Sequence, residues 1–117
     1  MNTITEIANR LSSLCFEQKF LDAYTELFSD HAKSIDPIYK NEPLTGLGHL
    51  IERERQFLSR TEIHGINVSE PLYAGNYFSV VISMDFTVEG QERKKMEELG
   101  VYKVENGKIV SQQFFIG

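Results

Sequence analysis

Residues 78–88 alternate apolar with mostly polar side chains without a break. A strict period of two predicts a β-strand, because successive side chains point to opposite faces of a sheet. One face of this strand is wholly apolar and consists of Phe78, Val80, Ile82, Met84, Phe86 and Val88. The other face is mixed and carries Ser79, Val81, Ser83, Asp85 and Thr87. The chain therefore has to cover one side of a long sheet and can leave the other side partly polar.

The first sixty residues follow a helical period instead. Thr3 and Glu6 form a capping-box pattern at the start of a first helix, and residues 20–28 form a second. A third helix is predicted from Thr45 or Gly46, with the charged residues 52–55 mostly exposed. The apolar stripes of the three helices are Ile4, Ile7, Ala8, Leu11, Leu14 and Cys15, then Phe20, Ala23, Tyr24, Leu27 and Phe28, then Leu47, Leu50, Ile51, Phe57 and Leu58.

After Arg60 the period of two returns, with Ile66 and Val68 on one face of a strand. Strands are predicted over residues 93–104 and 109–116, joined at Asn106-Gly107, a pair suited to a type I′ hairpin. Helices followed by a strand meander predict the α+β class. We expect one domain over residues 1–117, with three N-terminal helices on a long, curved, mainly antiparallel sheet that forms a cone with an internal pocket.

Composition excludes several classes of protein. A net charge of −5 argues against a nucleic-acid partner, and no apolar run approaches the roughly 20 residues of a membrane span. The N-terminus lacks the features of a signal peptide, and the single cysteine, Cys15, fits a reducing compartment. His31, His49 and His64 show no metal-ligand spacing. We expect a cytoplasmic protein without metal or cofactor.

Three patterns carry a resemblance to a known family. They are "FSDHAKSIDP" after the second helix, "TGLGHLIERERQFL" at the third, and "VYKVENGKIVSQQFF" at the last hairpin. Together they resemble the nuclear transport factor 2-like superfamily, in its SnoaL-like polyketide cyclase and ketosteroid isomerase branch. The resemblance covers nearly the whole chain and implies the cone-shaped fold. It leaves activity open, because this scaffold serves enzymes, ligand carriers and association modules.

The resemblance places the general base of the isomerases at Asp36, in "IDP". It places their two oxyanion donors at about Ser12 and at Leu99, which are no equivalents. True ketosteroid isomerase activity is therefore not expected, since enolisation needs donors for the developing oxygen charge. The cyclase branch implies less demanding chemistry, in which one carboxylate shuttles a proton.

Each candidate catalytic residue also has a structural interpretation. Asp36 precedes Pro37 and could simply cap a turn. Glu97 is predicted to face the pocket if Leu99 and Val101 do, with Glu98 outside, but a one-residue bulge would reverse this. His64 shares the face of Ile66 and Val68 and is either a second acid/base or a structural residue.

The pocket wall is predicted to contain one polar contact, Gln112, among apolar residues, namely Phe114, Met84, Phe86, Leu99, Ile82 and Phe57. We expect a SnoaL-like protein that binds a small apolar or carbonyl-bearing molecule, as a cofactor-free isomerase, cyclase or lyase. The alternative is a non-catalytic ligand-binding or dimerisation module. The resemblance also implies a homodimer through the outer face of the sheet.

Overall fold

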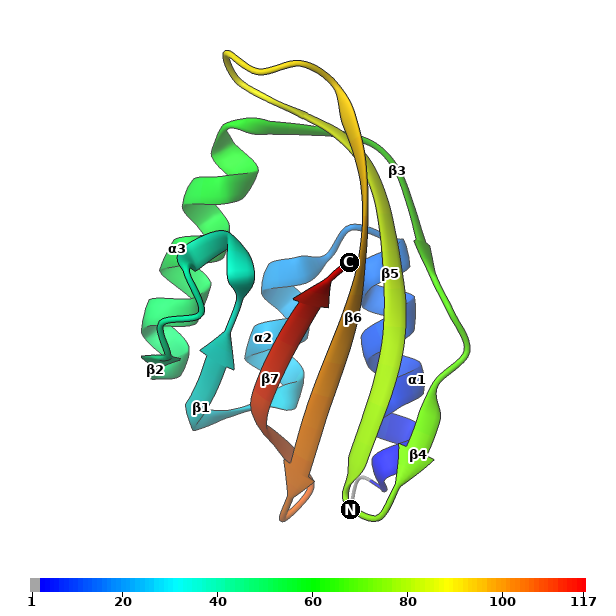
Figure 1. Cartoon of the computed structure of the whole chain (residues 1–117). Coiled ribbons are helices and arrows are strands. Elements are labelled where there is room, and N and C mark those ends of the chain that lie inside the picture. Colours follow the sequence, from blue (N-terminus) through cyan, green and yellow to red (C-terminus); the bar gives the residue numbers. More distant parts are fainter. Residues whose placement is uncertain (1–2) are drawn as a thin grey trace.

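In the computed structural model, which describes residues 3–117, three helices pack on a seven-stranded sheet (Figure 1). The helices are α1 (Ile4–Phe16), α2 (Phe20–Leu27) and α3 (Leu47–Ser59), with a short 3₁₀ turn η1 (Pro37–Tyr39). The strands are β1 (Phe28–Ile35), β2 (Leu44–Thr45), β3 (Thr61–Val68), β4 (Leu72–Ala74), β5 (Tyr77–Val88), β6 (Lys94–Glu105) and β7 (Lys108–Ile116). The predicted α+β class is confirmed.

The strand order is β2-β1-β7-β6-β5-β3, with β4 added to β5. All pairs are antiparallel except β1 with β7, which run parallel. β5 and β6 form a long curved hairpin that extends past the helices (Figure 1). At the β6–β7 turn, Asn106 and Gly107 both adopt positive φ, as the predicted Asn-Gly hairpin requires.

Local capping explains where the first helix starts. The Thr3 hydroxyl accepts a hydrogen bond from the Glu6 amide, and the Glu6 carboxylate accepts one from the Thr3 amide. This capping box is the one the sequence predicts. The second helix, by contrast, ends at Leu27 and not beyond Phe28, because the chain enters β1 there.

The prediction of which β6 residues point into the cone is wrong. Glu97 and Leu99 point outward: the Ser83 hydroxyl donates to Glu97 at 3.3 Å, and Leu99 is 40% exposed. The inward residues are Met96, Glu98, Gly100, Tyr102 and Val104. Two of these, Tyr102 and Val104, are buried and fix the face, whereas Gly100 between Glu98 and Tyr102 hides the apolar pattern.

Gly100 allows the ring of Tyr102 to lie against the strand. A Cβ at position 100 would stand 3.0 Å from Cε2 and from the hydroxyl of Tyr102, and 3.2 Å from Phe114. The Tyr102 ring stacks on Phe78 at a centroid distance of 4.9 Å and meets Phe114 edge-on at 6.2 Å. This aromatic group holds β5, β6 and β7 together on the inner face.

We therefore expect Gly100→Ala to lower the free energy of unfolding by about 1–3 kcal/mol, because the added methyl overpacks the core. Urea denaturation followed by circular dichroism measures the change. Gly48→Ala is the matched control, since nothing lies within 4 Å of its added Cβ. Equal stabilities of the two variants would contradict this description of the inner face.

Candidate functional site

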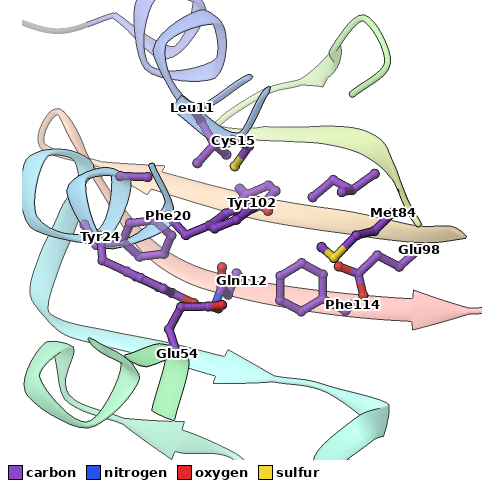
Figure 2. Close-up of a pocket in the computed structure, with 13 residues that line it drawn as sticks. Leu11, Cys15, Phe20, Tyr24, Glu54, Met84, Glu98, Tyr102, Gln112 and Phe114 are labelled. Carbon is purple, nitrogen blue, oxygen red and sulfur yellow. The ribbon is translucent and has the colours of Figure 1, made fainter. Parts of the chain in front are cut away.

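A cavity lies between the helices and the inner face of the sheet, and it has two adjoining lobes. Figure 2 shows the residues that line one of them. The aromatic lobe has a volume of about 80 Å³ and is lined by Leu11, Cys15, Phe20, Ala23, Phe28, Ile82 and Tyr102. The Arg53 lobe has a volume of about 90 Å³ and is lined by Ser34, Asp36, Ile38, Tyr39, Leu50, Arg53, Phe57 and Met96. Both lobes share Tyr24, Glu54, Met84, Glu98, Gln112 and Phe114.

Two glutamates enter the cavity from different walls. Glu54 comes from α3, near Gln112, and Glu98 comes from β6, beside Met84 and Phe114 (Figure 2). Neither carboxylate forms a hydrogen bond or an ion pair with any residue in 3–117. Both side chains are half-buried against apolar walls and have no compensating partner among these residues, which disfavours the ionised form.

This desolvation changes how the two glutamates ionise. Burial raises the pKa of Glu54 to about 7; the positive charge of Arg53 opposes the rise, and the negative charge of Asp36 adds to it. Burial also raises the pKa of Glu98 to about 7, with smaller contributions from the charges of Asp36 and Glu54. At neutral pH the cavity thus holds two carboxyl groups that can each gain or lose a proton.

A chain of hydrogen bonds fixes the polar part of the wall. The buried Gln112 amide donates to the Tyr24 hydroxyl at 2.8 Å and to the Ser34 hydroxyl at 3.0 Å. Arg53 also donates to Ser34, at 3.2 Å, and its guanidinium lies 4.0 Å from the ring centre of Tyr39. Because Tyr24 accepts from Gln112, its own proton is free for another acceptor.

Asp36 caps a turn and also lines the cavity. Its Oδ1 accepts a hydrogen bond from the Ile38 amide at 2.9 Å and caps η1. The side chain also lines the Arg53 lobe, and burial raises its pKa, although the Ile38 hydrogen bond and the Arg53 charge oppose the rise. The turn is thus observed, while catalysis by Asp36 stays a prediction.

Two candidate acid/base residues lie outside the cavity. His64 was predicted on the face of Ile66, but a bulge between Ile63 and Gly65 turns it to the outer face. There its Nε2 lies 2.8 Å from the Thr87 hydroxyl. Glu97 also lies on the outer face. The predicted inward orientation of both residues is therefore wrong.

Of the seven predicted ligand contacts, five line the cavity and two do not. Cavity-lining positions are occupied by Gln112, Phe114, Met84, Ile82 and Phe57. Phe86 is buried and packs edge-on against Phe57 at 6.2 Å, without lining either lobe. Leu99 faces outward, because the face of β6 that points into the cavity is the opposite of the predicted one. Ligand binding by the five lining residues stays a prediction.

Glu54 and Glu98 were not predicted as site residues, although the sequence contains a pattern that indicates each of them. Glu54 lies on the stripe of Leu47, Leu50 and Phe57 at helical spacing, although its charged neighbours suggested an exposed face. The prediction that residues 52–55 are mostly exposed is right for Glu52 and Arg55 and wrong for the other two. Glu98 alternates with Tyr102 and Val104, which would have placed it inward.

Two further features, a metal site and a membrane-spanning helix, are not found among the described residues. Within 3–117, no three His, Cys, Asp or Glu side chains gather closely enough to hold a metal ion. In that same part of the chain, no helix has the length and apolar character needed to cross a membrane.

The model of the SnoaL-like domain family matches residues 2–116. The chain belongs to this family. A candidate SnoaL-like polyketide cyclase from Mesorhizobium loti has a solved structure that is 28% identical to this SnoaL-like chain. The match covers 97% of this chain and 98% of the other, with a TM-score of 0.88. A comparison with curated proteins gives no match.

Two more distant structures share the fold. A protein with a ketosteroid isomerase-like fold from Catenulispora acidiphila, in complex with trimethylamine, is 14% identical, with coverage of 98% and 88% and a TM-score of 0.79. An LEH-like epoxide hydrolase from M. tuberculosis is 11% identical, with coverage of 97% and 82% and a TM-score of 0.75. At these identities the likeness shows the fold alone.

The half-buried cavity glutamates predict a dependence of stability on pH. Because the pKa of Glu98 is raised from 4.5 to about 7, the folded protein binds more protons in this range and loses stability as pH rises. We expect Glu98→Gln to raise the free energy of unfolding at about pH 8 by on the order of 2–3 kcal/mol, and to change it little at about pH 4.

Thermal and urea unfolding at both pH values measure this difference. Glu97→Gln is the matched control, because it removes a neighbouring carboxylate that faces solvent. A Glu98→Gln variant no more stable than Glu97→Gln at the higher pH would contradict the desolvation of Glu98.

Proposed function

We propose that this SnoaL-like protein binds a small apolar, carbonyl-bearing molecule and moves a proton within it without a cofactor. The observation that supports this most directly is the pair of glutamates, each with a pKa of about 7, on different walls of an apolar cavity. An acid or base works best when its pKa lies near the working pH. Two such groups facing one bound molecule can remove a proton from one atom and deliver a proton to another.

The two glutamates also influence each other. The charge of Glu54 raises the pKa of Glu98, so removal of the first proton makes removal of the second harder. Near neutral pH the singly protonated pair is favoured. One carboxylate then takes a proton from the carbon next to the carbonyl, and the other carboxyl gives its proton to the carbonyl oxygen. The enol oxygen then returns its proton to the second glutamate, and the first glutamate delivers its proton to a different carbon, which yields an isomer.

The cavity offers hydroxyl donors for the carbonyl oxygen. The free proton of Tyr24 and the hydroxyl of Tyr102, which lines the aromatic lobe, take the part that Ser12 and Leu99 do not fill. Leu99 faces outward, and the buried Ser12 hydroxyl, which has no hydrogen-bond partner among residues 3–117, lines neither lobe. Donors aimed at developing oxygen charge contribute strongly to enolisation.

Asp36 remains a second candidate for the base, and its role can be separated from that of the glutamates. If Asp36 carries the proton, Asp36→Asn abolishes transfer. If the glutamates carry it, the same change removes a negative charge that raises their pKa. Activity then survives, and its dependence on the ionised glutamate shifts to lower pH.

We expect the protein to accelerate deuterium exchange next to the carbonyl of cyclohex-3-en-1-one and its conversion to the conjugated enone. Nuclear magnetic resonance follows the exchange, and ultraviolet absorption follows the conjugation. Glu54→Gln and Glu98→Gln should each lower the rate by about a hundredfold. Glu97→Gln should leave it unchanged. Exchange that persists in both cavity variants, or that Asp36→Asn alone abolishes, would contradict the role of the glutamate pair.

We further propose that the protein forms a homodimer through the outer face of the sheet. A non-catalytic module with this fold would dimerise in the same way. Leu99 and Phe115 are paired across β6 and β7 and are 40% and 48% exposed, beside Val81 on β5. Neighbouring Ser83 and Glu97 make the face part polar. Interfaces of this mixed kind are common between soluble proteins.

Sedimentation equilibrium tests the dimer. We expect the native protein to dimerise and Leu99→Glu to be monomeric, because the introduced charge would be buried without a partner. Phe16→Glu on α1 is the control, since Phe16 is also apolar, is 62% exposed and lies away from the outer face of the sheet. A native protein that stays monomeric, or equal dissociation of both variants, would overturn the proposed interface.

A further inference from the structure

The aromatic lobe has an imbalance of charge. Its lining contains two acidic residues, Glu54 and Glu98, and no basic residue. Five aromatic rings complete much of the remaining wall, contributed by Phe20, Tyr24, Phe28, Tyr102 and Phe114. Aromatic faces carry partial negative charge and attract cations, so the rings and the carboxylates favour the same kind of ligand.

The protein does not supply a cation of its own to this lobe. The basic residue that lines the cavity, Arg53, belongs to the other lobe. Its guanidinium is held by the ring of Tyr39, at 4.0 Å, and by the hydroxyl of Ser34, at 3.2 Å. Within residues 3–117 no cationic group lies within 4.0 Å of the Glu54 or Glu98 carboxylate. A counter-charge would have to come from a ligand.

Tyr102 gives an independent indication of a polar ligand. This residue is only 2% exposed, and its hydroxyl finds no hydrogen-bond partner among the described residues. The side chain lines the aromatic lobe and extends over Gly100, whose missing side chain makes room for the hydroxyl (Figure 2). The hydroxyl thus borders the cavity without a partner among residues 3–117, and a ligand with N–H groups would satisfy its oxygen.

We infer that the aromatic lobe binds a small alkylammonium ion, a protonated amine with a compact apolar body. Its N–H groups donate to Glu54, Glu98 and the Tyr102 hydroxyl, while its alkyl body contacts the aromatic rings. The cavity volume of about 80 Å³ limits this body to a few carbon atoms. The inference goes beyond the proposed proton transfer, because it requires binding and no chemical step.

Binding of such a cation is coupled to protonation. A positive charge beside the carboxylates favours their ionised form and lowers their pKa, so binding at neutral pH expels protons from the glutamates. An alkylammonium keeps its own proton up to about pH 10. The affinity therefore rises with pH through the range in which the glutamates ionise. The charges of Asp36 and Arg53, both in the neighbouring lobe, shift the pKa of Glu54 in opposite directions, and Asp36 also raises the pKa of Glu98.

Isothermal titration calorimetry with three probes of nearly equal shape tests the inference. The probes are tert-butylammonium, the neutral tert-butanol and the anionic pivalate. We expect the cation to bind at about pH 8, and the other two to bind at least about tenfold more weakly. Repeating the titration in two buffers of different ionisation enthalpy counts the released protons. Binding of the cation should weaken by about tenfold between pH 8 and roughly pH 5.5.

Variants locate the site. Glu54→Gln and Glu98→Gln should each lower the affinity for the cation by about tenfold and reduce the proton release. Glu97→Gln should change neither quantity. If a cavity variant fails to fold, the pH dependence and proton release of the native protein still decide. Equal binding of all three probes, strongest binding of pivalate, no binding of the cation, or affinity that is independent of pH would overturn the inference. Loss of catalysis alone would leave it standing.

Discussion

Two glutamate carboxylates, half-buried in an apolar cavity without a counter-charge, are the constraint on which the rest of this site depends. Water would stabilise their ionised forms, but the aromatic and aliphatic walls of the cavity exclude much of it. The protein therefore keeps two groups that ionise near neutral pH at a cost to its own stability. The core formed by the helices and the inner sheet face offsets that cost. Groups of this kind concentrate at functional sites.

The surrounding architecture explains how the carboxylates are held in place. Glu98 sits on the long β5–β6 hairpin, whose inner face is fixed by the stack of Tyr102 on Phe78. Glu54 sits on α3, and the neighbouring Arg53 ties that helix to β1 through Ser34. Gln112 then joins Ser34 to Tyr24 of α2. The polar wall thus connects two helices and two strands, which restricts the geometry of anything bound between them.

Much of the fold could be predicted from local sequence patterns, and the site could be predicted less well. The face of β5 follows from uninterrupted alternation, and the start of α1 follows from its capping box. The face of β6 was misread because Gly100 interrupts its apolar residues. β1 was missed because Phe28 continues the helical spacing of α2, while the parallel pairing of β1 with β7 is a contact distant in sequence. Local patterns cannot show such a contact.

The same limit applies to the functional residues. Gln112 was placed inward by its hairpin register, but its partners Tyr24 and Ser34 lie 88 and 78 residues away along the chain. The desolvation of Glu54 likewise depends on sheet residues far from α3 in sequence. Asp36 was found because it stands in a recognisable motif. The glutamates stand in none, and only the packed cavity distinguishes them from the exposed Glu52 and Glu97.

The most direct test is a titration of the glutamate side-chain carboxyls by carbon-13 nuclear magnetic resonance. Glu54→Gln and Glu98→Gln assign the two resonances. We predict that both carboxyls titrate with an apparent pKa of about 7, above the ordinary glutamate value of 4.5. Titration of Glu54 and Glu98 near that ordinary value would contradict the account, because neither carboxylate would then be desolvated.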